Sequence, residues 1–314
     1  MGNNILPISV LIPSMNRPES LERTLTTYFQ SNYVPNEVVV VDQSQKIEIQ
    51  NLYKSIVEKF QKYANIKYVY QEEPSSAVAR NTATCNATND ILIYSDDDVD
   101  VYNETLEQCY KVMNKDDVAL VAGIDDNTKS ANMLTGYIVG SKSFFKRKIG
   151  HVTKAVLGRY PNRVKGEVET QWAMGYFFAV KKSLVEKWCI LWDNNLKGYA
   201  YGEDWDFSYN YYKAAKSENI KCVLSENVRV KHMVSTEYRV PSRQSIYATV
   251  INRRYLGYKH NMGVMSIVAQ NWFNFWVLVR RFLSGDNYKD YLAAMRIVKK
   301  NKQSIKNGNI TLFK

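Results

Sequence analysis

The sequence predicts an α/β protein with a mostly parallel central sheet and flanking helices. Short apolar runs with strong strand preference recur at residues 8–12, 38–41, 66–70 and 91–94. Segments with helical spacing of apolar residues separate these runs, a rhythm typical of parallel strands joined by right-handed crossovers. A chain of 314 residues is long enough for one such domain and a smaller helical extension.

The elements follow from local signals in chain order. Pro18 and Glu19 suit the start of the first helix, because a missing amide and a negative charge are both tolerated there. Further strands are expected at residues 118–122 and 172–180, with an alternating edge strand at 228–232, and further helices at 47–63, 182–188 and after the loop at 72–76. No Gly-x-Gly-x-x-Gly loop follows the first strand, so a dinucleotide-binding or kinase-type phosphate loop is disfavoured.

Charge and cysteine content narrow the class of protein. The formal net charge is +11, which favours an anionic partner such as nucleic acid, an anionic membrane surface or a nucleotide-linked substrate. The four cysteines are scattered without metal-ligand spacing, as expected for reduced core thiols. The first residues show no secretory signal, so a cytoplasmic location is expected.

An acidic cluster follows the strand predicted at residues 91–94. Asp96, Asp97 and Asp98 come almost directly after it. In open α/β sheets ligands bind beyond the carboxyl ends of the strands, so these carboxylates are expected at the mouth of a crevice. Two interpretations stay open for the cluster alone: a site for a divalent cation, or a solvated acidic turn that caps the next helix.

Other polar residues fall at the predicted ends of elements. Asp42 follows the second strand, and Glu203 and Asp204 lie where a helix begins, a position that favours negative charge. His232 ends the strand predicted at residues 228–232. A lone histidine is more often a surface or core residue, but a candidate metal cluster elsewhere in the chain raises the ligand interpretation.

The stretch at residues 129–165 is basic and contains no Asp or Glu. Apolar residues such as Phe144 and Phe145 are interleaved with its lysines and arginines. A membrane-surface element, a nucleic-acid contact and a solvated loop near an anionic substrate each account for this composition.

The tail is basic, aromatic and helical. Residues 262–279 are uncharged and about long enough to span a bilayer, but Ser266, Gln270 and Asn274 recur every four residues. A narrow polar stripe on a wide apolar helix is more typical of a helix lying in a membrane interface. Packing on the preceding α/β domain, or an oligomer contact, stays open as the alternative. Gly257 and Gly263 are expected to mark the end of the preceding helix.

Taken together, these features resemble a family 2 glycosyltransferase of the GT-A fold, of the non-processive bacterial polysaccharide or glycan type. The resemblance covers about residues 5–235, which leaves 236–314 as a C-terminal helical region. The order and spacing of the markers that carry it are specific together, whereas each marker alone is weak. The markers are Pro13, Asn16, Arg17, Asp42, Ala79-Arg80-Asn81, Asp96 to Asp98, Glu203, Asp204 and His232.

The resemblance implies a nucleotide-binding role for the earlier markers. Pro13, Asn16 and Arg17 would form a turn at the nucleotide, and Asp97 would also lie in the donor-binding site. Asp42 would hydrogen-bond the base. Asp96 would bind the ribose or the metal, and Arg80 would approach the diphosphate or hold the acidic cluster. Asp98 would bind Mn²⁺ or Mg²⁺ with His232 as a further ligand.

The later markers imply the chemistry. Asp204, in a catalytic pair with Glu203, would be the general base that removes a proton from the acceptor hydroxyl, and attack would invert the anomeric carbon. The implied donor is a nucleotide sugar, with a UDP-sugar favoured. The implied acceptor is a glycan or a lipid-linked glycan. An anionic membrane surface and a second copy of the chain are further expected partners, and no nucleic acid is expected. No Gln-x-x-Arg-Trp motif occurs, which favours addition of a single sugar.

Two departures from the family pattern concern nucleotide identity. Ser75 and Ser76 stand where a glycine is common, and Gln43 follows Asp42 where a second acid is common. Two rival functions stay open: a sugar-1-phosphate nucleotidyltransferase, and a non-catalytic glycan- or nucleic-acid-binding protein on the same scaffold. The turn between Pro13 and Pro18 does not resemble the glycine-rich loop that the first rival requires.

Overall fold

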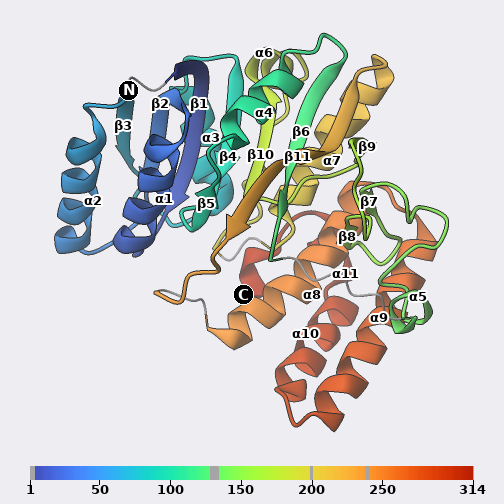
Figure 1. The fold of residues 1–314 in the computed structure, drawn as a ribbon. Coiled ribbons are helices and arrows are strands. Elements are labelled where there is room, and N and C mark those ends of the chain that lie inside the picture. The colour runs from blue at the N-terminus through green and yellow to red at the C-terminus, as the bar shows by residue number, and fades with distance from the viewer. Residues whose placement is uncertain (1–3, 128–133, 199–200, 238–240, 314) are drawn as a thin grey trace.

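The computed structural model describes residues 4–127, 134–198, 201–237 and 241–313. Within them, one large mixed sheet is covered by helices on both faces, and a group of C-terminal helices packs beside it (Figure 1). Residues 129–133 of the basic stretch lie outside the described residues.

The strands of the large sheet are β1 (Asn4–Ser14), β2 (Tyr33–Asp42), β3 (Asn65–Tyr70), β4 (Ile91–Ser95), β5 (Val99–Val101), β6 (Val118–Asp125), β9 (Glu167–Glu169), β10 (Phe177–Lys181) and β11 (Lys221–His232). A separate small hairpin is formed by β7 (His151–Val152) and β8 (Gly158–Arg159).

The helices are α1 (Pro18–Gln30), α2 (Ile47–Phe60), α3 (Ser76–Asn86), α4 (Thr105–Met113), α5 (Thr135–Ile138), α6 (Lys182–Lys187), α7 (Glu203–Ser217), α8 (Ser242–Lys259), α9 (Val264–Leu283), α10 (Tyr288–Lys300) and α11 (Lys302–Lys306). A 3₁₀ turn, η1 (Thr311–Phe313), follows.

The strand order is β3-β2-β1-β4-β10-β6-β11-β5, with β9 paired to β11. The predicted mostly parallel sheet is confirmed for β1 to β4, and β6 and β11 are also parallel to each other. β10 is antiparallel to β4 and β6, so all these parallel strands end at one edge of the sheet.

The edge-strand prediction for residues 228–232 is wrong. They belong to β11, which lies between β6 and β5. Their alternation has another cause: Val228 and Val230 are buried in the core that α4 covers, whereas Arg229 and Lys231 point to the exposed face. A strand with one face covered by a helix and one face exposed shows the same alternation of apolar and polar residues that was expected for an edge strand.

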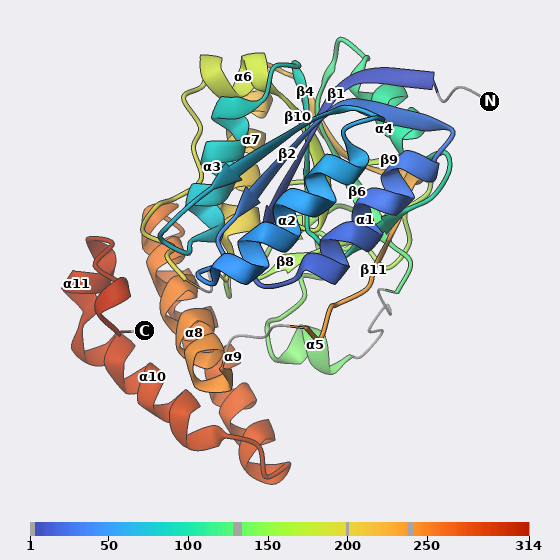
Figure 2. The same ribbon diagram turned by 90° about the vertical axis from the view of Figure 1, so that its left-hand side faces the viewer.

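Two apolar cores lie on the two faces of the sheet, each between the sheet and the helices that cover it. Figure 2 shows the ribbons of these helices. α1, α2 and α4 pack on one face, and α3, α6 and α7 pack on the other. The branched apolar side chains of β1, β2 and β4 point alternately into these two cores, which explains why their sequences are continuously apolar. Of the four cysteines, Cys109 and Cys222 are core thiols as expected, but Cys85 and Cys189 are exposed.

A third apolar core joins the C-terminal helices to the rest of the protein. Side chains of α8, α10 and α11 pack there with Trp172 and Trp205. Gly257 does not end a helix as expected but lies inside α8, where a Cβ atom would come within 2.6 Å of Nε2 of Gln270 in α9. The glycine therefore allows the close approach of α8 and α9. None of the described helices is both long and apolar enough to cross a bilayer.

Candidate active site

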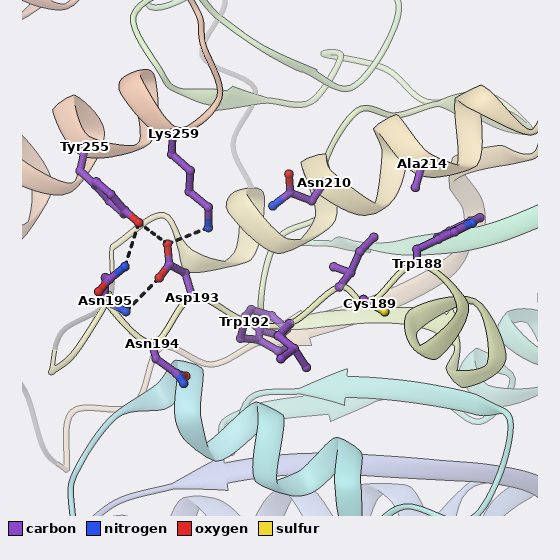
Figure 3. A pocket seen from close by; sticks show the side chains of 12 residues that line it. Trp188, Cys189, Trp192, Asp193, Asn194, Asn195, Asn210, Ala214, Tyr255 and Lys259 are labelled. Carbon is purple, nitrogen blue, oxygen red and sulfur yellow. Dashed lines mark hydrogen bonds and ion pairs between the residues drawn. The ribbon is translucent and has the colours of Figure 1, made fainter. Parts of the chain in front are cut away.

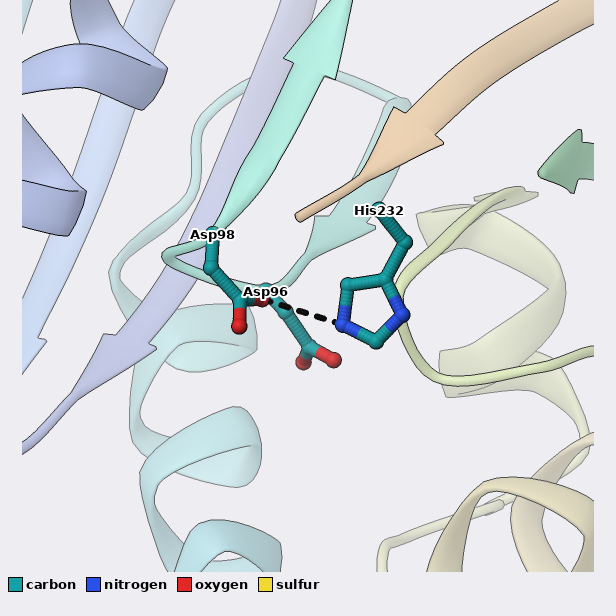
Figure 4. A group of neighbouring side chains, drawn as sticks. All are labelled: Asp96, Asp98 and His232. Carbon is teal, nitrogen blue, oxygen red and sulfur yellow. Dashed lines mark ion pairs between the residues drawn. The ribbon is translucent and has the colours of Figure 1, made fainter. Parts of the chain in front are cut away.

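The candidate site lies at the edge where the parallel strands end. β4 ends at Ser95 and continues directly into the acidic cluster, and β11 ends at His232. In the antiparallel pairing of β11 with β5, His232 lies opposite Val99, the residue after Asp98. Strand register thus brings the imidazole to the acidic cluster across a large sequence separation (Figure 4).

Asp96, Asp98 and His232 form a candidate metal centre. One ligand atom from each lies within 4.8 Å of the others. Oδ1 of Asp98 lies 3.1 Å from Nε2 of His232, yet this buried oxygen makes no well-aligned hydrogen bond. Two carboxylates and an imidazole are suitable ligands for Mn²⁺, and the buried, unsatisfied oxygen of Asp98 suits coordination of a cation.

Electrostatics favour the charged forms of this cluster. Burial lowers the pKa of His232, but the contact with Asp98 and the charge of Asp96 outweigh it, so the pKa is raised. Burial opposes ionisation of Asp98, yet His232, the amide of Ser235 and Arg17 together lower its pKa. The backbone N–H of Ser235 donates to Oδ2 of Asp98 at 2.7 Å, which leaves Oδ1 directed at the imidazole.

Asp97 is not among the three grouped ligands and is engaged by Ser14 and Arg17. It accepts a hydrogen bond from Oγ of Ser14 at 2.5 Å and another from Nη1 of Arg17 at 3.1 Å. Burial raises the pKa of Asp97 to about 7, although the charge of Arg17 opposes this. Nη1 of Arg17 is also 3.6 Å from Asp98. Arg17 therefore offsets part of the negative charge of the cluster.

Arg80 of α3 links the acidic cluster to α7. Its Nη2 atom lies 2.8 Å from Oδ1 of Asp96, and its Nη1 atom contacts Oε1 of Glu203. The guanidinium also lies 4.7 Å from the ring centroid of Trp192 and is almost fully buried. A planar fork donor suits such a two-sided contact, because one group must satisfy two carboxylates.

Glu203 and Asp204 occupy the first turn of α7. The helix begins after Gly202, whose φ of 87° and contact with the Trp205 side chain require glycine. Oδ2 of Asp204 accepts a hydrogen bond from the backbone N–H of Gly175 at 3.1 Å. Burial raises the pKa of Asp204, and burial raises the pKa of Glu203 to about 7 in spite of Arg80.

The remaining predicted residues gather at the ends of β1 and β2. Asp42 lies opposite Ser14 in the sheet and is fully buried, with its oxygens accepting from the Ser44 amide and the Tyr68 hydroxyl, each at 2.8 Å. Asn16 has a φ of 58°, and its backbone N–H donates a hydrogen bond to Oγ of Ser44. Pro13 lies in β1 beside β2. This group is joined to the acidic cluster through Ser14.

Several residues of the site were not anticipated from the sequence. Ser14 was detectable in principle, as a polar residue at the end of a predicted buried strand. Ser76, which donates to Glu203, had a weaker signal at a helix start. Tyr176, whose ring stacks on His232 with centroids 5.4 Å apart, and Trp192 carried no sequence signal.

A separate cavity of about 580 Å³ lies between residues 188–195, α7 and α8 (Figure 3). Asp193 accepts hydrogen bonds there from the Tyr255 hydroxyl and the Lys259 ammonium, each at 2.7 Å. None of the candidate metal ligands lines this cavity. Its polar groups already serve to fasten α8 to the preceding loop.

The sheet order and the arrangement of acids at its carboxyl edge define a GT-A protein. A sequence profile for glycosyl transferase family 2 matches residues 9–188, more than half of the chain. The chain therefore belongs to glycosyl transferase family 2, and it is a glycosyltransferase. No curated protein matches the chain.

Solved structures share the fold at low sequence identity. A mannosyltransferase, PcManGT from Pyrobaculum calidifontis in complex with GDP-Man and Mn²⁺, has 14% identity and a TM-score of 0.56 over 96% of this chain and 84% of its own. GalNAc-T7 with UDP, GalNAc and Mn²⁺ has 16% identity and a TM-score of 0.56 over 84% of this chain and 54% of its own. S. aureus TarS has 17% identity and a TM-score of 0.52 over 88% of this chain and 44% of its own.

Proposed function

We propose that this enzyme transfers a single sugar from a nucleotide-sugar donor to a glycan or lipid-linked acceptor, with inversion at the anomeric carbon. The observation that carries the proposal is the convergence of Asp96, Asp98 and His232 beside Asp204, joined through Arg80. The structural neighbours crystallised with GDP-Man and with UDP support a nucleotide sugar as donor.

Asp98 and His232, with Asp96, are the residues that would hold Mn²⁺ or Mg²⁺. A bound cation would neutralise the charge that builds on the departing nucleoside diphosphate. The imidazole favours Mn²⁺ over Mg²⁺, and two neighbours contain Mn²⁺. Arg80 would hold Asp96 in position from the opposite side, and Arg17 would orient Asp97.

Asp204 is the proposed general base. Its raised pKa makes the carboxylate more basic and so a better proton acceptor for the hydroxyl of the acceptor. The backbone N–H of Gly175 fixes the orientation of the carboxylate. The base would take the proton of the hydroxyl as its oxygen attacks the anomeric carbon opposite the leaving group. Glu203 would act on this step by positioning Arg80, because its Oε1 atom is already engaged by that guanidinium.

Asp42, Asn16 and Pro13 are proposed to form the nucleoside end of the donor site. Asp42 would hydrogen-bond the base, with a UDP-sugar favoured, once its Tyr68 contact opens. Residues 1–235 would form the catalytic domain and residues 236–314 the helical region. We also propose a cytoplasmic enzyme that acts at the membrane surface as a peripheral protein, where a lipid-linked acceptor would lie.

A panel of nucleotide sugars tests this proposal directly. We expect one donor to be hydrolysed slowly in the presence of Mn²⁺, to raise the melting temperature, and to release a nucleoside diphosphate. The control is the same panel with chelator. Release of pyrophosphate from a sugar phosphate and a nucleoside triphosphate would instead assign the nucleotidyltransferase reaction. Donor-independent, salt-sensitive binding to DNA or RNA would favour a binding protein.

A further inference from the structure

α9 is turned with its apolar side outward. Its polar residues Ser266, Gln270 and Asn274 are buried, whereas a water-exposed helix normally buries its apolar side. The exposed apolar residues of the helix are Val264, Met265, Val268, Trp272, Phe275, Trp276, Phe282 and Leu283. From Met265 to Trp276 they recur at helical spacing, and half-buried Val279 links them to Phe282 and Leu283, so they lie along one side of the helix.

Two buried arginines of α8 explain this orientation. Nε of Arg254 donates to Oε1 of Gln270 at 3.0 Å, and the guanidinium of Arg253 contacts Oδ1 of Asn274. The hydrogen bonds of both guanidinium groups within the described residues go to neutral oxygens, those of Thr249, Asn274 and Tyr291 for Arg253 and those of Gln270 and Asn271 for Arg254. The polar stripe of α9 thus supplies the hydrogen-bond acceptors that these buried cations require, and the apolar side is left facing out.

A second segment extends the apolar stripe. Leu134, Ile138, Phe144 and Phe145 are exposed, with Phe145 at 98%. Nε1 of Trp272 donates to the carbonyl of Ile138 at 2.9 Å, which fastens α5 beside α9 (Figure 1). These four residues and the eight of α9 are called the α9 face below.

Most charges around the α9 face are positive, although Asp286 is exposed just beyond the end of α9. Lys146, Arg147 and Lys148 are exposed next to Phe144 and Phe145, and the Arg147 guanidinium lies 4.4 Å from the Phe144 ring centroid. Arg280 is exposed in the last turn of α9. No Asp or Glu occurs in residues 134–165 or 264–285. An apolar area bordered mainly by cations is complementary to a surface that is apolar inside and anionic at its rim.

We propose that the α9 face docks on an anionic phospholipid bilayer, with α9 lying parallel to the membrane plane. Phe145, Trp272 and Phe275 enter the boundary between headgroups and acyl chains, and the basic residues contact lipid phosphates. A second copy of the chain is the weaker occupant, because two faces of equal positive charge on a chain of net charge +11 repel. The α9 face would be the membrane-binding surface of the proposed peripheral enzyme, and membrane binding does not require the proposed reaction.

Vesicle flotation tests the docking surface. The full chain is mixed with vesicles of phosphatidylcholine alone or with added phosphatidylglycerol. We expect it to float with the anionic vesicles only, and less at high salt. The variant with Phe145→Ser and Phe275→Ser should partition roughly tenfold less or lower. A matched control, Ile47→Ser with Leu52→Ser, removes two exposed apolar side chains of α2 and should float as the unmodified chain does.

Other outcomes overturn the proposal. If the unmodified chain stays with the buffer, or if the α2 control loses as much binding as the α9-face variant, this surface is not the docking site. Light scattering that shows a dimer dissociated by Phe275→Ser would assign the face to a second copy. The vesicles contain no donor or acceptor, so a failure of the proposed reaction would leave this result unchanged.

Discussion

The guanidinium of Arg80 contacts the carboxylate of Glu203, and this contact connects the start of α3 to the start of α7. The same guanidinium reaches Asp96 with its other terminal nitrogen. One buried cation thus sets the distance between the candidate metal centre and the helix that carries the proposed base. Oε2 of Glu203 and Nε of Arg80 are buried without a hydrogen-bond partner, so the link is not fully satisfied by the protein itself.

Replacing Arg80 should destabilise the protein strongly. Arg80→Met leaves the Asp96 and Glu203 carboxylates without their common cation, and we expect a loss of about 3–5 kcal/mol in the free energy of unfolding. Arg80→Lys should rescue only part of it, since an ammonium lacks the planar fork. Arg229→Met is the control, because the exposed pair of Arg229 with Asp126 should contribute about 0–1 kcal/mol. Equal losses in denaturant titrations of the two Met variants would refute the special position of Arg80.

Asp98→Asn should weaken metal binding. The amide removes one charged oxygen ligand, and we expect the affinity for Mn²⁺ to fall by at least about 10–100-fold in calorimetric titrations. Asp100→Asn is the matched control: it changes the same residue type two positions away, where the side chain pairs with Arg23. If both variants bind Mn²⁺ as the unmodified chain does, the metal centre lies elsewhere.

Asp204→Asn should abolish transfer and leave donor binding nearly intact. The asparagine oxygen can still accept from the Gly175 amide, but it cannot take a proton from the acceptor. We expect the transfer rate to fall by about 10²–10⁴-fold while the Kd for the donor changes little. A large loss of donor affinity would contradict the assignment of Asp204 as base.

His260 should make stability depend on pH. Its Nε2 atom lies 2.6 Å from Oδ1 of Asp206, and its Nδ1 atom lies 3.1 Å from Nζ of Lys213, which suits a neutral ring that donates to Asp206 and accepts from Lys213. Burial lowers the pKa of His260 below its usual 6.5, with Asp206 opposing this shift and Lys213 and Lys259 adding to it. Its contribution is therefore present above pH 6.5 and is lost as the pH falls through the lower folded-state pKa.

His260→Asn should remove that pH dependence. We expect the difference in unfolding free energy between the unmodified chain and the variant to be constant above about pH 7 and to shrink below about pH 6.5. Denaturant titrations at closely spaced pH values measure it. A difference that does not change with pH would show that His260 does not titrate in this way.

The sequence was sufficient for the parallel strands β1 to β4 and for the polar residues where the strands end. Asp42 ends a plainly apolar strand, Asp98 comes shortly after another, and His232 ends an alternating one. Because parallel strands end together, a common edge for these residues could be predicted. The functional roles of these residues remain predictions. Ser14 could have been added by the same rule.

Other features depend on tertiary contacts that periodicity does not encode. The polar stripe of α9 was visible, but the side it faces is decided by Arg253 and Arg254 in another helix. The interior place of β11 follows from its pairing with β5, a three-residue strand too short to recognise. Trp192 reaches Arg80 from a loop and therefore has no pattern of its own.

The core that α8, α10 and α11 share with Trp172 and Trp205 couples the unfolding of the terminal helices to that of α7. Trp205 follows Asp204 directly, so any opening of the last helices uncovers the first turn of α7. Heating should therefore melt the sheet and the terminal helices in a single calorimetric peak, and a chain cut short before α8 should lose the ordered turn that carries Glu203 and Asp204.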